Sequence, residues 1–585
     1  MKSIVGYLLS TILFLHFATP VLAAEFFASP SGTAEGDGSI DRPWDITTAF
    51  TKTAEVSPGD TLWLRGGLYG EGGATRFAIT LDGSLEQPIT IRGYQDERAT
   101  VNGEIYCGVD ASYITFRNFE LTNTEENRTL PNLQRAPGIT LHCQGAKVIN
   151  MLIYNTGHPA IGLWDAAGTS EIYGNLIWGT GTYDTTTNVA NPIRRGAAIY
   201  TQNKHPEYSR LIKDNIIWRN FTFGIKVFGV VGGGDNYTIE GNTVFDHRDA
   251  NIYYGSESDP VENAILEFNN TYHRPELGRE NEWLSTLVGD ATMDNVNTRI
   301  RNNYFVDGKS KHGALLVHTF QDVVVENNTL VSNNILARWV VPPSGVTHAV
   351  WDNNTYFSRN SNPRFIYNDL TNVLTPSQWR TQTGFDTNSS INAGPPTGMH
   401  IAVRPNTYDD GRGHVTVYNW EGATEAALDL NSVLEPNQEY VIKDAQHYFG
   451  PALATGIYTG EEVLVPLTRT EVHRLTGTMN HMQGIENTHT PSEFNVFVVQ
   501  GGEVREPTPS PSPANQVTSP EMSPSGTPEA SPSPTGEAED NIDPSIDHQP
   551  VDPEPLPATE PTGPRATFES WLQRILDAFR RFFNR

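Results

Sequence analysis

The sequence predicts an all-β protein in which a solenoid of stacked coils is followed by a small β-sandwich. The first observation is a phrase of alternating apolar residues around an asparagine, which returns at intervals of 25 to 40 residues. A repeat of this length, built from strands and turns, is typical of stacked coils. The asparagines of the phrase are Asn118, Asn150, Asn175, Asn215, Asn242, Asn270, Asn303, Asn328 and Asn354. The second observation is a series of short strands split by Pro, Gly, Asn and Asp over residues 396–502, as in a β-sandwich.

We interpret the repeated asparagine as a structural residue. Asparagine tolerates the left-handed conformation that a sharp bend requires, and its amide can hydrogen-bond to the copy in the next coil. We therefore expect an asparagine ladder with no catalytic role. Coils stacked in this way form a long open groove, and that shape suits a polymer better than a small molecule.

Residues 24–395 are expected to form the solenoid. Its start is predicted to hold a short amphipathic helix, Ile46 to Ala54, which Asp45 would cap, followed by a strand from Thr61 to Arg65. Because the open end of a solenoid exposes apolar residues, we expect this helix to cover it. Residues 366–395 are expected to be an irregular end of the solenoid.

The first residues, MKSIVGYLLSTILFLHFATPVLAA, combine Lys2, an apolar run and small residues around Ala23. They predict a signal peptide over residues 1–23, so the mature chain would be secreted, or held at the cell surface or in the periplasm. No later segment has the roughly 18 to 20 apolar residues that span a bilayer. The formal net charge of −28 argues against a nucleic-acid partner, because little positive charge is left to neutralise phosphates.

The chain is expected to end in two further segments. Residues 503–564 are almost entirely Pro, Ser, Thr, Glu and Asp, which predicts a disordered linker. Residues 565–585 carry aromatic and aliphatic residues at helical spacing with arginines among them, which predicts a basic amphipathic helix. Such a helix would bind a membrane surface or a protein partner, or fold back onto its own chain. We expect the protein to be a monomer.

The two cysteines of the chain are Cys107 and Cys143. In an exported protein they could pair across neighbouring coils, or they could remain two buried thiols that behave as small apolar side chains. Two cysteines are too few to build a metal-ligand cluster.

Three segments carry a resemblance to a known family. They are the entry phrase PWDITTAF…SPGDTLWLRGGLYG, the run from GHPAIGLW to NYTIEGNTVF, and AVRPNTYDDGRGHVTVYNWEG. From Glu25 to about Val499 the chain resembles the secreted bacterial right-handed parallel β-helix proteins of the pectin-lyase-like superfamily. The resemblance implies a right-handed parallel β-helix and action on polysaccharides, since lyases and hydrolases of uronic-acid polysaccharides share this superfamily. Such proteins often carry histidines where this chain has Ala197, Ala198 and Lys226, so it would use other groups or lack the activity.

The second apolar strand of each coil supplies the candidate site. If the strands AIYTQ, GIKVF and NIYYG align on their isoleucines, these point inward and the residue after each points outward. Aligning instead on Gly229 and Gly255 would bury Asn251, which we consider the weaker alternative. The first outward row then consists of Tyr200, Lys226 and Tyr253. A second outward row consists of Trp164, Gln202 and Phe228.

A lysine between tyrosines has a use in β-elimination of a uronate. Lys226 would take the proton at C5, and Tyr200 or Tyr253 would act as the acid, or as acid and base together. Arg248 or a bound cation would neutralise the carboxylate. The expected substrate contacts are Trp164, Gln202, Phe228 and His247. The alternative is a solvated surface lysine with ordinary aromatic neighbours.

A calcium cofactor is compatible with the aspartates near these strands, although no spacing concentrates them. The aspartates concerned are Asp214, Asp235, Asp246 and Asp249. No pair of carboxylates suited to glycoside hydrolysis stands out on the outward rows. The sequence therefore favours a lyase for an acidic polysaccharide, with a non-catalytic glycan-binding or structural surface protein as the alternative.

Overall fold

The computed structural model describes residues 23–504 in one compact unit, apart from short gaps. The gaps are residue 72 and residues 130–134, 185–192, 230–232, 257–258, 276–285, 290–292 and 478–487. Nearly all of the predicted signal peptide and linker, and the whole C-terminal helix, lie outside the described residues. No helix in the described ranges has the length and apolar character needed to cross a membrane.

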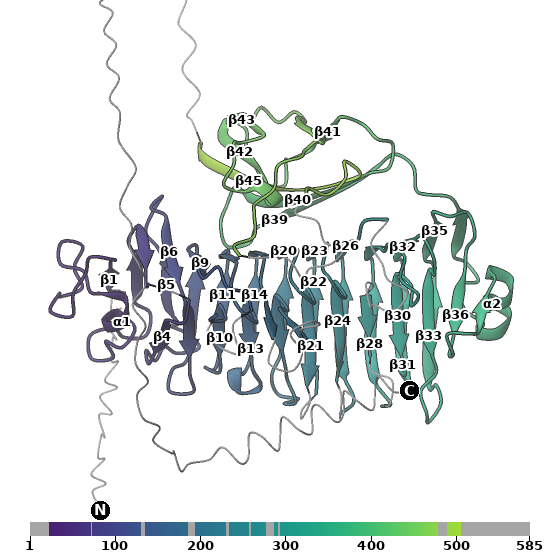
Figure 1. Cartoon of the computed structure of the whole chain (residues 1–585), viewed down its shortest axis with the longest axis horizontal. Helices are drawn as coiled ribbons and strands as arrows, with labels where there is room; N and C mark the ends of the chain where they lie inside the picture. Colours follow the sequence, from purple (N-terminus) through teal and green to yellow (C-terminus); the bar gives the residue numbers. More distant parts are fainter. Residues whose placement is uncertain are drawn as a thin grey trace, which may run out of the picture. The chain divides into compact units, whose positions relative to one another are not determined.

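Three long sheets form a β-helix in the described part of the chain, and each sheet has twelve strands (Figure 1). Sheet A consists of β1 (Glu25–Ala28), β2 (Thr61–Leu64), β5 (Ile89–Gly93), β8 (Ile114–Arg117), β11 (Lys147–Ile149), β14 (Ser170–Tyr173), β19 (Arg210–Lys213), β22 (Tyr237–Glu240), β25 (Glu262–Glu267), β28 (Val296–Arg301), β31 (Asp322–Glu326) and β34 (His348–Asp352). Sheet B consists of β3 (Gly67–Tyr69), β6 (Ala99–Asn102), β9 (Glu120–Thr122), β12 (Leu152–Tyr154), β15 (Leu176–Trp178), β20 (Ile216–Trp218), β23 (Thr243–Phe245), β26 (Asn270–Tyr272), β29 (Tyr304–Val306), β32 (Thr329–Ser332), β35 (Thr355–Ser358) and β38 (Ser390–Ala393).

Sheet C carries the strands that hold the candidate site. It consists of β4 (Arg76–Ile79), β7 (Glu104–Cys107), β10 (Ile139–Leu141), β13 (Ile161–Leu163), β18 (Ile199–Thr201), β21 (Ile225–Gly229), β24 (Ile252–Ser256), β27 (Thr286–Val288), β30 (Leu315–His318), β33 (Ala337–Val340), β36 (Phe365–Tyr367) and β37 (Val373–Leu374). Neighbouring strands pair in parallel except β36 and β37. A short antiparallel hairpin, β16 (Thr182–Asp184) and β17 (Ile193–Arg195), precedes β18.

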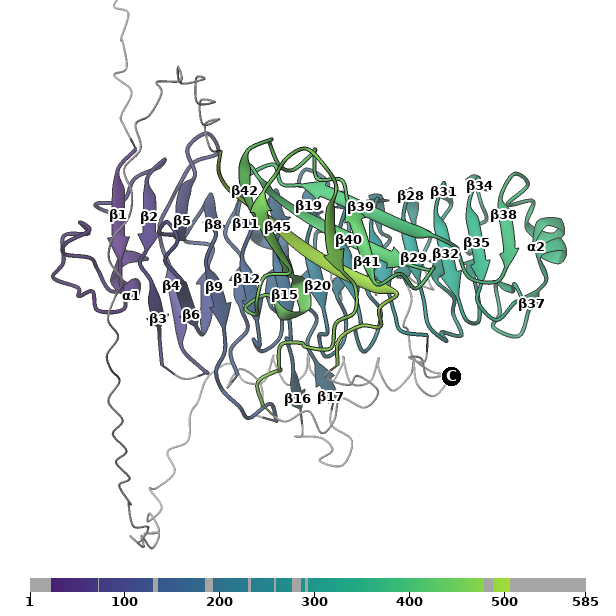
Figure 2. The ribbon, with the colours of Figure 1, turned by 90° about the horizontal axis from the view of Figure 1, so that it is seen from above.

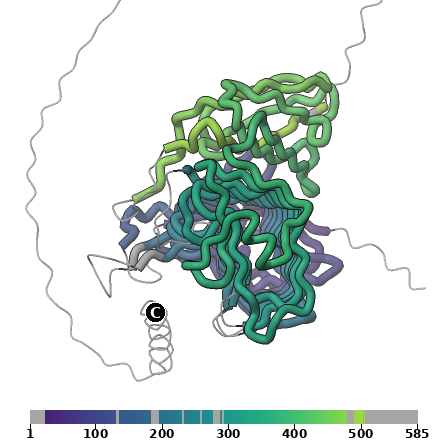
Figure 3. Tube along the Cα trace, turned by 90° about the vertical axis from the view of Figure 1, so that its right-hand side faces the viewer, coloured from purple at the N-terminus to yellow at the C-terminus, as the bar shows by residue number. Residues whose placement is uncertain are grey.

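Files of like residues fill the interior, as the period-2 pattern predicts. From β7 to β24 of sheet C one inward file consists of isoleucines, all fully buried: Ile105, Ile139, Ile161, Ile199, Ile225 and Ile252. Burying each such side chain stabilises the fold by about 1.5–3 kcal/mol. Figure 3, which views the solenoid end-on, shows the coils superposed along its axis.

The asparagine ladder is present between sheets A and B, with a changed membership. Each ladder asparagine after the first accepts hydrogen bonds from the backbone N–H and the side-chain amide of the asparagine one coil earlier, and the first, Asn175, accepts from the Met151 N–H at 2.9 Å. The members are Asn175, Asn215, Asn242, Asn269, Asn303, Asn328 and Asn354. The prediction that Asn270 belongs to the ladder is wrong, because its neighbour Asn269 occupies that position.

The left-handed conformation belongs to the residue before each ladder asparagine, and not to the ladder asparagine itself. This position is held by residues such as Gly174, Asp214 and Gly241, which have φ values of 68°, 54° and 66°. Asn118 and Asn150 occupy it too, with φ values of 54° and 53°, so they are not ladder members. Asparagine therefore recurs at two neighbouring positions for two different reasons. The first position needs a left-handed bend, and the second needs a buried hydrogen bond.

Short helices cover both ends of the β-helix. At the N-terminal end, α1 (Ile46–Ala49) is shorter than expected, and the Asp45 carboxylate caps it by accepting from the Thr48 N–H at 2.9 Å. At the other end α2 (Pro376–Thr383) lies within the segment that was expected to be irregular (Figures 1 and 2). Its buried Trp379 donates to an Asp386 carboxylate oxygen at 2.7 Å. Cys107 and Cys143 form a disulfide between neighbouring coils.

A β-sandwich follows the β-helix. A five-stranded antiparallel sheet consists of β39 (Met399–Pro405), β40 (Arg412–Asn419), β45 (Phe494–Val504), β42 (Gln438–Asp444) and β43 (Ala454–Ile457). It faces a two-stranded sheet of β41 (Glu425–Leu428) and β44 (Val463–Pro466). Two single-turn helices complete the described elements, η1 (Asp165–Ala167) and η2 (Ala445–His447).

The sandwich packs on the outward face of sheet B (Figure 1). The Phe494 ring stacks on Tyr272, and the Tyr418 ring on Tyr304, each with centroids 4.4 Å apart. At the turns beside sheet B the Arg404 guanidinium donates to Asp214 at 2.7 Å and to Glu240 at 3.0 Å. The sandwich therefore covers the middle of sheet B, whereas on sheet C the outward side chains of Tyr106, Tyr200, Lys226, Phe228 and Tyr253 are partly exposed.

Five buried histidines predict that the fold weakens in mild acid. Burial lowers the pKa of His273 to about 4, that of His312, His318 and His414 to about 3, and that of His247 well below its ordinary value. Unfolding restores a pKa near 6.5, so the unfolded chain binds more protons below that pH. For each histidine the free energy of unfolding then falls by up to about 1.4 kcal/mol per pH unit as the pH decreases from 6.5 toward 4.

We expect the free energy of unfolding to fall by at least about 3 kcal/mol between pH 7.5 and pH 5.5, measured by denaturant titration. The stabilisation is complete above pH 6.5 and is lost below it. Burial raises the pKa of Asp307 to about 7 and that of Asp235 to about 6, and these two groups act in the opposite direction against the five histidines. Equal unfolding free energies at the two pH values would contradict this expectation.

Candidate functional site

The predicted register of sheet C is confirmed. Tyr200 pairs with Lys226, and Lys226 with Tyr253, so the three residues lie in one outward row across β18, β21 and β24. Gly162 on β13 continues this row. The second row is also as predicted, because its residues directly follow the paired residues Leu163, Thr201 and Val227. The catalytic and binding roles of these residues stay predictions.

Lys226 lies among aromatic rings. Its Nζ is 4.5 Å from the ring centroid of Phe228, 4.7 Å from Phe223, 5.6 Å from Tyr253 and 5.9 Å from Tyr200. The rings of Phe223 and Phe228 each pack against Tyr253 at 5.5 Å. The outward face thus presents one amine with a tyrosine on either side, on a surface that is otherwise largely aromatic.

Tyr200 connects the two outward rows. Its hydroxyl accepts a hydrogen bond from the Gln202 side-chain amide at 3.0 Å, and its ring contacts Trp164 at 5.4 Å. The His158 ring meets it edge-on at 6.1 Å. Burial lowers the pKa of His158 to about 3, with smaller contributions from the charges of Arg195 and Lys226. His158 is therefore neutral near pH 7 and adds polarity to the site without charge.

Arg195 is a residue that the sequence analysis missed. It ends β17 of the hairpin that leads into β18, and its charge acts on His158 together with that of Lys226. This brings a second cation to the neighbourhood of the lysine. The only signal in the sequence was a pair of arginines just before the strand GAAIYTQ.

The structure corrects two of the predicted site residues. His247 is fully buried: its Nδ1 accepts from the Asn220 N–H at 3.1 Å, and its Nε2 lies 3.3 Å from the Ile217 carbonyl oxygen. Arg248 is 3% exposed and lies in the same turn. Neither side chain can contact a polymer on the outer face, so the predicted substrate contact of His247 and the predicted carboxylate role of Arg248 are wrong.

The aspartates considered for calcium are engaged elsewhere. The Asp246 carboxylate accepts from Arg274 Nε at 2.8 Å, and Asp214 accepts from Arg404 Nε at 2.7 Å. Within the described ranges no three Asp, Glu, His or Cys side chains gather closely enough to hold a metal ion. We therefore derive no step through a calcium ion.

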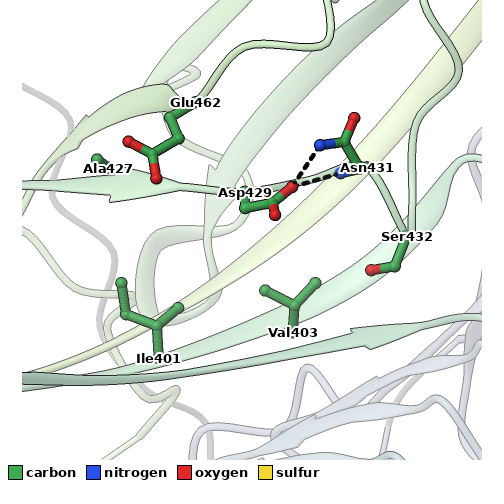
Figure 4. Close-up of a pocket in the computed structure, with 7 residues that line it drawn as sticks. All are labelled: Ile401, Val403, Ala427, Asp429, Asn431, Ser432 and Glu462. Atoms are coloured by element: carbon green, nitrogen blue, oxygen red, sulfur yellow. Dashed lines mark hydrogen bonds between the residues drawn. The ribbon is translucent and has the colours of Figure 1, made fainter.

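A groove also lies in the sandwich, away from the residues considered so far. It measures about 700 Å³, and its apolar part consists of Ile401, Val403 and Ala427 (Figure 4). Asp429 and Glu462 stand at its rim, where an Asp429 carboxylate oxygen accepts from the backbone and side chain of the neighbouring Asn431. Since that carboxylate is held in a local turn and no lysine, histidine or tyrosine lines the groove, we place the candidate chemistry on sheet C.

Among known proteins the chain has a local match in sequence and distant matches in structure. No family model matches the sequence. Over 91 residues the chain is 32% identical to pectate lyase PEL9 of Emericella nidulans, a match that covers 16% of this chain and 21% of that protein. The chain thus spans about a fifth of the length of the curated relative that it matches. Its fold is the right-handed parallel β-helix that the sequence resemblance implied.

Solved structures with a similar arrangement are distant in sequence. The GH136 lacto-N-biosidase from Eubacterium ramulus has a TM-score of 0.41 at 15% identity, over 63% of this chain and 67% of that one. A mannuronic acid specific polysaccharide family 6 lyase from human gut microbiota has a TM-score of 0.39 at 14% identity, over 59% and 83%. Pectate lyase Pel9A has a TM-score of 0.31 at 12% identity, over 64% and 78%.

Proposed function

We propose that this protein is a lyase that cleaves an acidic, uronate-containing polysaccharide by β-elimination on the outward face of sheet C. The observation that carries the proposal is the row of Tyr200, Lys226 and Tyr253, which presents an amine and phenol hydroxyls on an open aromatic face. The local similarity to a pectate lyase supports the same class of substrate.

The row and the nearby Arg195 together offer a group for each step of an elimination. Lys226, as the neutral amine, takes the proton from C5 of the uronate, and the electron pair forms the double bond between C4 and C5. The bond from C4 to the bridging oxygen breaks, and the Tyr200 hydroxyl gives its proton to that oxygen. Arg195 pairs with the carboxylate and so stabilises the charge that develops next to C5. Proton exchange with water restores both side chains.

The residues present on this face favour a lyase over a glycoside hydrolase. Hydrolysis needs two carboxyl groups on either side of the scissile bond, about 5 to 10 Å apart. Among the described residues, neither outward row between β7 and β24 contains an aspartate or glutamate. An elimination needs no such pair.

The test is incubation of the purified protein with pectate, alginate and glycosaminoglycans, followed by the ultraviolet absorbance of unsaturated uronate. We expect the absorbance to rise with at least one of these polymers. New reducing ends without a rise in absorbance would show that the protein is a hydrolase and not a lyase. Binding without either product would favour the alternative of a glycan-binding surface protein.

A further inference from the structure

Aromatic contacts on sheet C continue beyond the residues assigned to chemistry. The Trp164 ring stacks on His142 with centroids 5.7 Å apart and planes 3° from parallel. His142 in turn contacts Tyr106 at 5.7 Å, and the Arg76 guanidinium lies 4.7 Å from the Tyr106 ring centroid. Together with Tyr200, these side chains form an unbroken line of contacts from β4 to β21.

This line adds almost no free charge to the face. Arg76 is paired with the Glu104 carboxylate, whose oxygen lies 2.7 Å from Arg76 Nε. Burial lowers the pKa of His142, and the charge of Arg76 lowers it further, so the imidazole is neutral near pH 7. Tyr106, His142 and Trp164 all remain partly exposed on the outer face. Flat, neutral and partly exposed rings of this kind pack well against the faces of sugar rings.

The face ends abruptly on the other side of Lys226. The outward row continues from Tyr253 to Leu287 on β27 and Leu316 on β30. These two leucines point away from the interior, yet they are 3% and 0% exposed. A sugar chain lying on the row therefore cannot touch β27 or β30, and the row is next partly exposed at Arg338 on β33.

We propose that Tyr106, His142 and Trp164 are stacking subsites for the polysaccharide, and that the binding face extends from Lys226 toward β7 only. Four strand spacings separate β21 from β7, roughly 19 Å, whereas Tyr253, the last partly exposed residue before the buried Leu287, lies one spacing, about 5 Å, from Lys226. The assignment of Lys226 as the point of cleavage rests on the proposed function. The stacking subsites themselves do not require any cleavage.

The test is a binding titration of full-length protein with oligogalacturonides of three and six units, repeated with alginate oligomers. We expect the wild type to bind the longer oligomer more tightly. The double variant Tyr106→Leu/His142→Leu should lose roughly tenfold in affinity for six units and keep the affinity for three. Trp63→Leu is the matched control, because Trp63 on sheet A also carries an arginine 4.9 Å from its ring centroid.

Three results would overturn this inference: wild-type affinity of the double variant for six units, an equal loss for three and six units, or no binding of either oligomer class by the wild type. The two proposals fail in different ways. Length-dependent binding that requires Tyr106 and His142 but yields no unsaturated product would remove the lyase and keep the subsites. Elimination activity that stays at the wild-type level in the double variant would remove the subsites and keep the lyase.

Discussion

Replacing Lys226 with arginine is expected to lower the rate of β-elimination by at least about a hundredfold, the range usual for loss of a general base. Arginine keeps the positive charge and much of the length of the side chain, but it cannot be deprotonated in a protein. A loss of activity in Lys226→Arg therefore indicates that the lysine transfers a proton, and not that it only supplies a positive charge. The measurement is kcat/KM from the absorbance of unsaturated uronate, with thermal unfolding to verify the fold.

The matched control is Lys147→Arg, which makes the same change on sheet A, where Lys147 Nζ lies 3.1 Å from Glu171. This variant is expected to keep the wild-type rate. If Lys226→Arg retains most of the activity while Lys226→Met does not, the lysine binds the carboxylate and another group is the base. Wild-type rates in both variants would remove Lys226 from the site.

Replacing Asn242 with aspartate is expected to lower the free energy of unfolding by about 3 kcal/mol at pH 7. The Asn242 amide nitrogen donates to the Ile212 carbonyl at 2.8 Å and to Asn269 Oδ1 at 3.0 Å, at a fully buried position. A carboxylate there would face two oxygens that have lost their donor. Denaturant titration of the two proteins measures the difference.

An exposed row of asparagines offers the control for this change. Asn263 donates to Asn236 Oδ1 at 3.0 Å and accepts from Asn297, and all three lie at the surface. Asn263→Asp is expected to cost less than about 0.5 kcal/mol, because water replaces the lost partner. Similar costs at Asn242 and Asn263 would show that the buried ladder contributes no more than its exposed counterpart.

Local patterns were sufficient for the fold and for the register of the candidate site. Strand alternation fixes which residues face outward, so the row of Tyr200, Lys226 and Tyr253 followed from aligning three isoleucines. The ladder was less certain, because Asn269 and Asn270 are adjacent and a repeat of variable length cannot choose between them. The helix α2 was missed, since its apolar content is a single buried residue, Trp379.

The burial of His247 and Arg248 could not be read from the sequence. Their turn lies beside Arg274, which donates to the carbonyl oxygen of Thr488 in the sandwich, 214 residues later. No pattern near residue 247 indicates that a distant domain packs against this side of the β-helix. Arg195 was missed as a site residue for a related reason, because it lies on a hairpin that interrupts the repeat of the coils.

A crystal structure of the Lys226→Arg variant with a bound six-unit uronate oligomer tests the central claim most directly. The account predicts sugar rings along the outward face of sheet C between Tyr106 and Tyr253, with one carboxylate near Arg195 and residue 226. Sugar found only in the sandwich groove beside Asp429 and Glu462, or on another sheet, would contradict it.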